Sequence, residues 1–173
     1  MAIVIEQLTY RYGGASGGGR SRSDSAPSPM DAALNGVTMT IGEGEFLGVI
    51  GHTGSGKSTL MQQLCGLLTP TGGSVLVDGF DTRDKQQRKR ARALVGLVFQ
   101  YPEYQLFEET VEKDVAFGPK NLGLSDEEAR AHAREALELV GLPAERFAGK
   151  SPFDLSGGEK RRAALAGILA MRP

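Results

Sequence analysis

One stretch constrains this sequence more than any other: residues 51–58 read GHTGSGKS and fit the pattern G-x-x-x-x-G-K-[ST] at every fixed position. The apolar run 46–50 precedes it, and apolar residues at helical spacing follow from Leu60. This context predicts a buried strand, a glycine-rich turn and a helix that begins near Lys57. Backbone N–H groups of such a turn point at phosphate oxygens, which predicts a nucleoside triphosphate site.

Each residue type in this loop has a chemical reason. Glycine allows close approach of the backbone, Lys57 supplies positive charge to the β- and γ-phosphates, and the Ser58 hydroxyl can ligate Mg²⁺. The predicted nucleotide contacts are Gly51, His52, Thr53, Gly54, Ser55, Gly56, Lys57, Ser58 and Thr59. The loop alone does not separate a kinase, a GTPase and a transporter ATPase.

The remaining patterns predict a single α/β domain over residues 1–173. Strands are expected at residues 2–12, 37–41, 46–50, 74–77 and 94–99. The continuous apolar runs at residues 46–50 and 94–99 predict buried strands, the first of them covered on both faces of a sheet. Helices are expected at residues 57–68, 81–93, 125–140 and 156–171. Residues 13–29 are rich in Gly, Ser and Arg and predict a flexible insertion.

Composition and charge exclude several classes of protein. The net charge of −1 gives no field that would attract DNA or an anionic membrane. The lone Cys65 excludes an internal disulfide, and two histidines, His52 and His132, exclude a histidine metal cluster. A basic run at residues 83–92 could contact nucleic acid, but Asp84 and two glutamines interrupt it, which favours a solvated helix face.

A second motif, LSGGEK at residues 155–160, separates the nucleotide-binding classes. It has a purely structural interpretation as a Ser-x-x-Glu capping box, and a helix start with two glycines is also a phosphate site. The motif resembles the Leu-Ser-Gly-Gly-Gln signature of the ABC ATPases, with a glutamate in the glutamine position. The resemblance implies that ATP is sandwiched between two protomers, and that these residues contact the partner's γ-phosphate: Ser156, Gly157, Gly158 and Glu159.

The same resemblance implies further roles and a fold. Gln100 stands where the family places a glutamine that reaches Mg²⁺ and the attacking water, so Lys57 and Gln100 are the expected catalytic residues. Tyr12 stands at the end of the first strand, where the family stacks an aromatic ring on adenine; Tyr10 is the alternative, and either could be core. The implied fold is a P-loop NTPase with a RecA-like core, an antiparallel β subdomain and a helical subdomain at residues 101–150, with ATP and Mg²⁺ as cofactors.

Residues 51–60, 98–107 and 114–119 are similar to those of energy-coupling factor transporters, to the second of their paired ATP-binding proteins. This implies an importer of vitamins or metal ions, peripheral on the cytoplasmic face of the membrane. Its partners would be a second ATP-binding subunit, identical or paralogous, a transmembrane coupling subunit and a substrate-capture membrane subunit, without nucleic acid. A non-transport ABC ATPase of DNA repair or translation and a binding-only regulatory module remain alternatives.

Family members continue past Arg172 and Pro173 into an apolar strand that ends in Asp-Glu and then a histidine switch. We therefore expect the printed sequence to be a fragment, incomplete at its C-terminus, that binds nucleotide weakly and hydrolyses essentially none. Asp78, Asp81 and Asp84 are not expected to replace the missing acids, because no buried strand leads into them.

Overall fold

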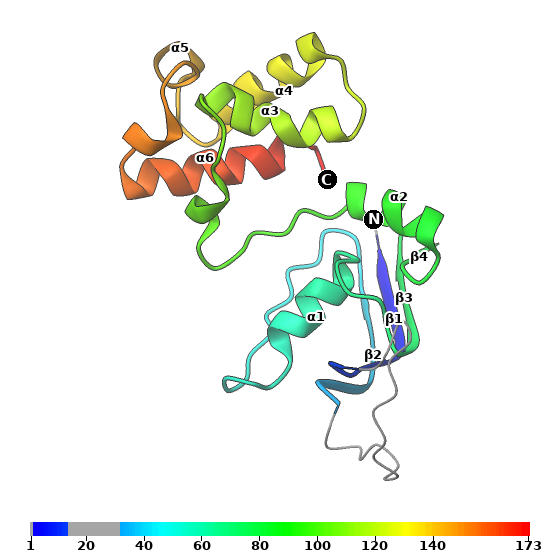
Figure 1. Cartoon of the computed structure of the whole chain (residues 1–173). Coiled ribbons are helices and arrows are strands. Elements are labelled where there is room, and N and C mark those ends of the chain that lie inside the picture. Colours follow the sequence, from blue (N-terminus) through cyan, green and yellow to red (C-terminus); the bar gives the residue numbers. More distant parts are fainter. Residues whose placement is uncertain (1, 14–31) are drawn as a thin grey trace. The chain divides into compact units, whose positions relative to one another are not determined.

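The computed structural model describes residues 2–13 and 32–173, which form two compact units, Met1–Val95 and Gly96–Pro173 (Figure 1). Each unit has a hydrophobic core of its own. The predicted insertion at residues 13–29 lies, apart from Gly13, outside the described residues. The predicted helical subdomain at residues 101–150 falls within the second unit.

An antiparallel sheet of four strands forms the frame of the first unit, in the order β2-β1-β3-β4. The strands are β1 (Ile3–Tyr10), β2 (Leu34–Ile41), β3 (Gly72–Val77) and β4 (Phe80–Asp81). Ile5, Leu8, Val75 and Val77 are fully buried. Ile3 and Ile5 follow the alternation of β1, and a register shift between Ile5 and Leu8 brings Leu8 to the same core. The strands predicted at residues 2–12, 37–41 and 74–77 are thereby confirmed.

Two helices accompany this sheet, α1 (Lys57–Leu64) and α2 (Lys85–Ala93). α1 buries Leu60 and Leu64 in the same core as β3. It ends earlier than the predicted Leu68, because the chain turns back there and the N–H groups of Leu67 and Leu68 both donate to the Gln62 carbonyl. Asp84 caps α2 by accepting from two backbone N–H groups, which delays that helix from the predicted residue 81.

The predicted buried strands at residues 46–50 and 94–99 are wrong for this structure. Neither run is extended into a strand, and Phe46 and Ile50 are almost entirely exposed, at 100% and 95%. A strand buried on both faces needs a hydrogen-bonded neighbour and apolar cover, and within residues 2–13 and 32–173 no strand pairs with either run.

Helices alone make the second unit, and its core is rich in alanine. Its elements are η2 (Pro102–Gln105), α3 (Val111–Asn121), α4 (Asp126–Leu139), α5 (Ala144–Phe147), η3 (Pro152–Asp154) and α6 (Gly157–Leu169). α3, α4 and α6 pack against one another around Val115, Ala133, Leu137 and Ala163. The predicted helices at residues 125–140 and 156–171 are confirmed, whereas α3 was not predicted. Among the described residues, no helix is long and apolar enough to cross a bilayer.

Candidate nucleotide site

The phosphate-type loop leads directly into α1, as predicted. Its last glycine, Gly56, is the N-cap of α1 in the left-handed conformation at φ 90°, and among the described residues no side chain caps the helix. A Cβ on Gly56 would lie 2.4 Å from the Ala33 carbonyl oxygen, so a larger residue does not fit there. The first N–H groups of α1 thus lack a side-chain acceptor, the arrangement that suits an anion.

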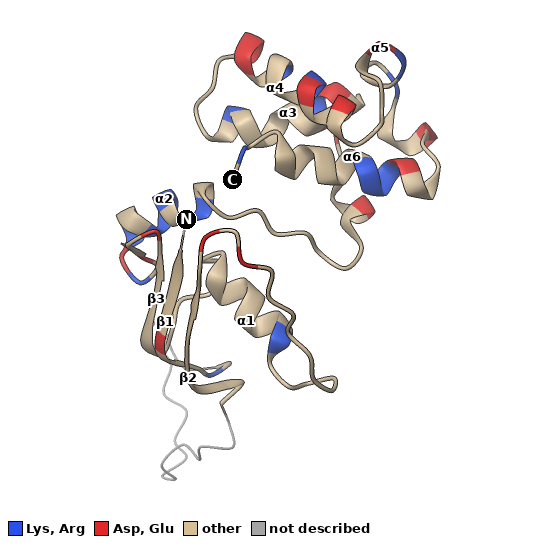
Figure 2. Cartoon of the chain, turned by 180° about the vertical axis from the view of Figure 1, so that it is seen from behind, with Lys and Arg blue, Asp and Glu red and all other residues tan. Residues whose placement is uncertain are grey.

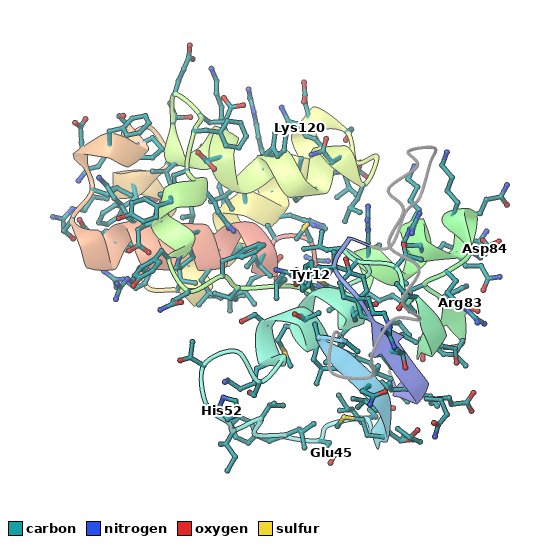
Figure 3. All side chains as sticks on the ribbon, turned by 60° about the horizontal axis from the view of Figure 1, so that its bottom comes forward. Tyr12, Glu45, His52, Arg83, Asp84 and Lys120 are labelled. Carbon is teal, nitrogen blue, oxygen red and sulfur yellow. The ribbon has the colours of Figure 1, made fainter. Side chains whose placement is uncertain are left out.

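Lys57 closes over this loop with its ammonium group. Its Nζ donates to the carbonyl oxygens of Gly51 at 2.7 Å and His52 at 2.9 Å, and to Ser55 Oγ at 3.3 Å. His52 lies on the outer part of the loop (Figure 3) and its Nδ1 is 2.9 Å from the Thr53 carbonyl oxygen. The loop is therefore an exposed turn held by a lysine that a phosphate could share.

Tyr12 lies beside α1. Strand β1 ends at Tyr10 rather than at Tyr12, and the Tyr12 hydroxyl is 2.9 Å from Thr59 Oγ1. The two tyrosine rings pack edge to face at 5.0 Å, and Tyr12 is 62% exposed while Tyr10 packs against the core. Of the two predicted base-stacking residues, Tyr12 is the one whose ring is open to a ligand.

A hydroxyl fit for Mg²⁺ is present at the start of α1. Ser58, the second residue of the helix, is exposed, while Thr59 is buried. Within the described part of the chain, no group of three His, Cys, Asp or Glu side chains could hold a metal ion. Mg²⁺ in proteins commonly combines one or two protein ligands with phosphate oxygens, and the exposed Ser58 hydroxyl fits such a role.

Two of the three aspartates that follow β3, Asp81 and Asp84, have structural partners for their side chains. Asp81 pairs with Arg83 at 2.7 Å, and hydrogen bonds from Arg83 hold the pKa of its carboxyl below the usual value. Asp84 caps α2 (Figure 3), and Asp78 lies in the turn between β3 and β4. The contacts of Asp81 and Asp84 are structural. Asp78, however, directly follows β3, whose Val75 and Val77 are fully buried, so the expectation that no buried strand leads into these aspartates is wrong for Asp78.

Most of the basic run on α2 is exposed, as predicted for a solvated helix face (Figure 2), and three of its arginines also make local contacts in the first unit. Arg92 donates from Nε and Nη2 to the Gly66 carbonyl at 3.0 and 2.8 Å, and Arg88 hydrogen-bonds the Thr69 hydroxyl. Arg90 stacks over the ring of Phe80 at 5.8 Å. These three guanidinium groups therefore have partners within the first unit, as suits a planar donor that can bond a carbonyl or lie over an aromatic ring.

The helix start at α6 combines both interpretations of the LSGGEK motif. The capping box is present: Ser156 N–H donates to Glu159 Oε2 at 2.8 Å, and Glu159 N–H donates to Ser156 Oγ at 3.4 Å. Hydrogen bonds from Ser156 lower the pKa of the Glu159 carboxyl. Gly157 and Gly158 are exposed, and no described atom lies within 4 Å of a Cβ built on either, so packing does not explain them.

Gln100 is also exposed and lies two positions before Pro102, the first residue of η2. Its Nε2 is 3.5 Å from the Tyr101 hydroxyl, and η2 packs on α6. The predicted site residues thus gather in two places. Tyr12 and residues 51–59 lie together in the first unit, and Gln100 and residues 156–159 lie in the second.

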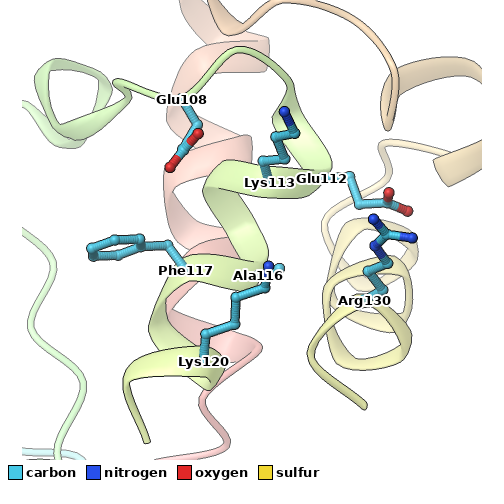
Figure 4. A pocket seen from close by; sticks show the side chains of 7 residues that line it. All are labelled: Glu108, Glu112, Lys113, Ala116, Phe117, Lys120 and Arg130. Atoms are coloured by element: carbon cyan, nitrogen blue, oxygen red, sulfur yellow. The ribbon is translucent and has the colours of Figure 1, made fainter. Parts of the chain in front are cut away.

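A charged groove between α3 and α4 was not predicted (Figure 4). Its lining includes Glu108, Glu112, Lys113, Phe117, Lys120 and Arg130. Lys113 pairs with Glu109 at 2.5 Å, and Lys120 pairs with Asp126 at 2.7 Å. Because both signs of charge line it, charge alone does not select a ligand for this groove.

Comparison with known proteins decides the family, since the model of the ABC transporter family matches residues 34–173. The chain belongs to the ABC transporter family. One similar solved structure is the dimeric ATP-binding cassette MJ0796 in a post-hydrolysis state with ADP and Pi bound. Its sequence is 31% identical and its TM-score is 0.76, and the match covers 99% of this chain and 70% of that one. The structure of cbiO1 from Clostridium perfringens, part of the ABC transporter complex cbiONQ, is 34% identical with a TM-score of 0.76, covering 99% and 62%.

Curated relatives refine this similarity within the family. The energy-coupling factor transporter ATP-binding protein EcfA2 of Caldanaerobacter subterraneus subsp. tengcongensis is 62% identical over 174 residues, and that of Clostridium perfringens is 57% identical over 175. Both alignments cover 100% of this chain and 57% of the relative, so the chain spans little more than half the length of these relatives. The P-loop NTPase fold predicted from the sequence is confirmed by the ABC cassettes.

Proposed function

We propose that this chain is the nucleotide-binding part of an energy-coupling factor importer, in which ATP binding and hydrolysis drive the uptake of a vitamin or metal ion. The observation that carries the proposal is the exposed loop at residues 51–56. The Lys57 ammonium donates to carbonyl oxygens of this loop, and among the described residues no side chain caps the start of α1. The names of the EcfA2 relatives support it at the level of the transporter class.

When bound, ATP supplies the phosphoanhydride bond that is cleaved, and Mg²⁺ supplies positive charge that neutralises the phosphate oxygens. Lys57 would donate to the β- and γ-phosphates, the N–H groups of the loop would hold the same oxygens, and Ser58 would ligate the metal. The open ring of Tyr12 would stack on adenine, fixed by its hydroxyl contact to Thr59. Gln100 would orient the attacking water and complete the metal ligands.

The second protein contact to nucleotide would come from another subunit, identical or paralogous. In this proposal the exposed residues 156–158 at the start of α6, with Glu159 behind them, reach the γ-phosphate held by the partner. A transmembrane coupling subunit would dock near the exposed aromatic rings of Tyr101, Tyr104 and Phe107, beside Gln100. A membrane subunit would capture the substrate, and the chain would lie at the cytoplasmic face.

The proposal is tested by purifying the natural protein from membranes, identifying co-purifying subunits by mass, and measuring ATP-driven uptake in vesicles with the subunits found. Association with membrane subunits and ATP-dependent uptake of a vitamin or metal ion are the expected results. Turnover of ATP without any membrane partner would instead support a non-transport ATPase, and binding without turnover would support a regulatory module.

A further inference from the structure

We propose that Glu103 and Arg161 are positioning residues that couple Gln100 to the start of α6. This inference rests on the proposed function, because it concerns the two segments of the second unit assigned there to nucleotide. Neither residue is expected to touch ATP itself.

An ion pair joins these two segments although 58 positions separate them in sequence. Arg161 Nε lies 3.4 Å from both carboxylate oxygens of Glu103, and Arg161 Nη2 lies 3.4 Å from Glu103 Oε1. The guanidinium therefore faces the carboxylate with two nitrogens. Only 16% of the Glu103 side chain is exposed, compared with 61% for Arg161, so Glu103 is the more enclosed member of the pair.

Both ends of the pair lie close to a proposed catalytic contact. Glu103 is in the one-turn helix η2, three positions after Gln100. η2 packs against α6, and its first residue, Pro102, is buried. Arg161 lies one helical turn after Gly157, and the Ser156–Glu159 capping box makes that first turn a rigid unit. A shift of η2 is thus transmitted to the start of α6, and a shift of α6 to η2.

The consequence concerns two nucleotides rather than one. In the proposed dimer, Gln100 acts on the nucleotide held by its own chain, whereas residues 156–158 act on the nucleotide held by the partner. The Glu103–Arg161 pair therefore links the two ATP sites through one chain. It is longer than the 2.7–2.9 Å of a tight charged hydrogen bond, so it contributes little to stability while it still fixes relative position.

The second unit provides a matched control pair. Glu112 and Arg134 join α3 to α4 at 2.6 Å, with side-chain exposures of 18% and 60% that nearly equal those of Glu103 and Arg161. This ion pair includes no residue of η2 and none of the start of α6. Its removal therefore reports what the loss of an ion pair alone does to this unit.

The experiment measures ATP turnover against ATP concentration, and the melting temperature, in the natural full-length transporter complex. Glu103→Gln and Arg161→Gln are each expected to lower kcat about tenfold or more, with KM little changed, and to bring the Hill coefficient toward one. The double exchange Glu103→Arg with Arg161→Glu is expected to recover most of the turnover. Glu112→Gln and Arg134→Gln are expected to leave kcat and the Hill coefficient within about twofold of the wild type.

Three results would overturn the inference: turnover in Glu103→Gln equal to that of the control variants, a charge exchange that recovers nothing, or a kcat loss that only parallels a lowered melting temperature. Lys57→Ala is measured in parallel to separate this inference from the proposed function. If Lys57→Ala abolishes turnover and Glu103→Gln does not change it, only the coupling fails; if Lys57→Ala retains full turnover, the proposed function itself fails.

Discussion

The starts of α1 and α6 are both glycine-rich and both are proposed to face phosphate, yet they are completed differently. At α1 the N-cap is left-handed Gly56, and no described side chain accepts from the helix N–H groups. At α6, Ser156 and Glu159 satisfy each other's N–H groups, and the two glycines between them stay exposed. A helix start can therefore be left for a ligand to complete, or completed by its own residues before a ligand arrives.

Among the tests of this difference between the two helix starts, Lys57→Ala is expected to have the largest effect. Because the ammonium would make charged hydrogen bonds worth about 1.5–3 kcal/mol each to phosphate, ATP affinity should fall about 100-fold or more and turnover should vanish. Titration with a fluorescent ATP analogue measures the affinity. Lys85→Ala, at the first residue of α2, is the matched control and should bind as the wild type does. Unchanged binding in Lys57→Ala would remove the phosphate assignment.

Alanine in place of glycine distinguishes the two starts by stability. Gly56→Ala places a Cβ 2.4 Å from a carbonyl oxygen in a left-handed conformation, and should lose more than about 1–2 kcal/mol of unfolding free energy. Gly157→Ala meets no described atom within 4 Å and should leave stability unchanged, while it lowers turnover by obstructing phosphate approach. Thermal denaturation decides; equal melting temperatures for the two variants would contradict the structure.

Removing the serine cap tests whether the α6 start has a role beyond folding. Ser156→Ala and Ser125→Ala delete the same capping box from α6 and α4, so each should cost about 1 kcal/mol of stability. Only Ser156→Ala should also lower ATP turnover in the transporter. If both variants lose turnover equally, the α6 start acts as an ordinary helix cap.

The smallest expected effect is a pH dependence of the α6 cap. Hydrogen bonds from Ser156 lower the pKa of Glu159 in the folded chain, below an unfolded value of about 4.3. A carboxyl of this kind stabilises the fold fully above the unfolded pKa and loses that effect as pH falls through the folded pKa. The melting temperatures of wild type and Glu159→Gln should therefore differ near pH 6 and converge toward pH 3; a constant difference would be inconsistent with the ionised cap.

Local signals in the sequence were reliable and long-range ones were not. Alternation predicted β1 and β2, the glycine loop predicted the start of α1, and two capping boxes predicted α4 and α6, because each signal lies within a few residues. Residues 46–50 and 94–99 failed because burial on both faces depends on partner strands that a short apolar run cannot specify. α3 was missed because Gly118 and Pro119 discourage a helix, although Pro119, itself buried, is tolerated in the last turn of α3.

The candidate site divides in the same way. Residues 51–59 and 156–159 are contiguous motifs and could be found from spacing. The approach of Gly56 to Ala33 and the pair between Glu103 and Arg161 join positions far apart in sequence, and no pattern along the chain announces either. Contacts of this kind appear only once the fold brings the segments together.

The two hydrogen bonds from Arg92 to the Gly66 carbonyl lie just beyond the C-terminal end of α1, and they also affect its N-terminal end, where the phosphate loop lies. This helix has eight residues, so it is only about 12 Å long, and an isolated helix of that length would fray. The guanidinium fork anchors the turn that follows its last residue, while the other end carries the phosphate loop. We therefore expect Arg92 to help keep α1, and with it the phosphate loop at the other end of the helix, in a fixed position. A lysine at this position would keep the charge but could not donate two parallel hydrogen bonds to one carbonyl.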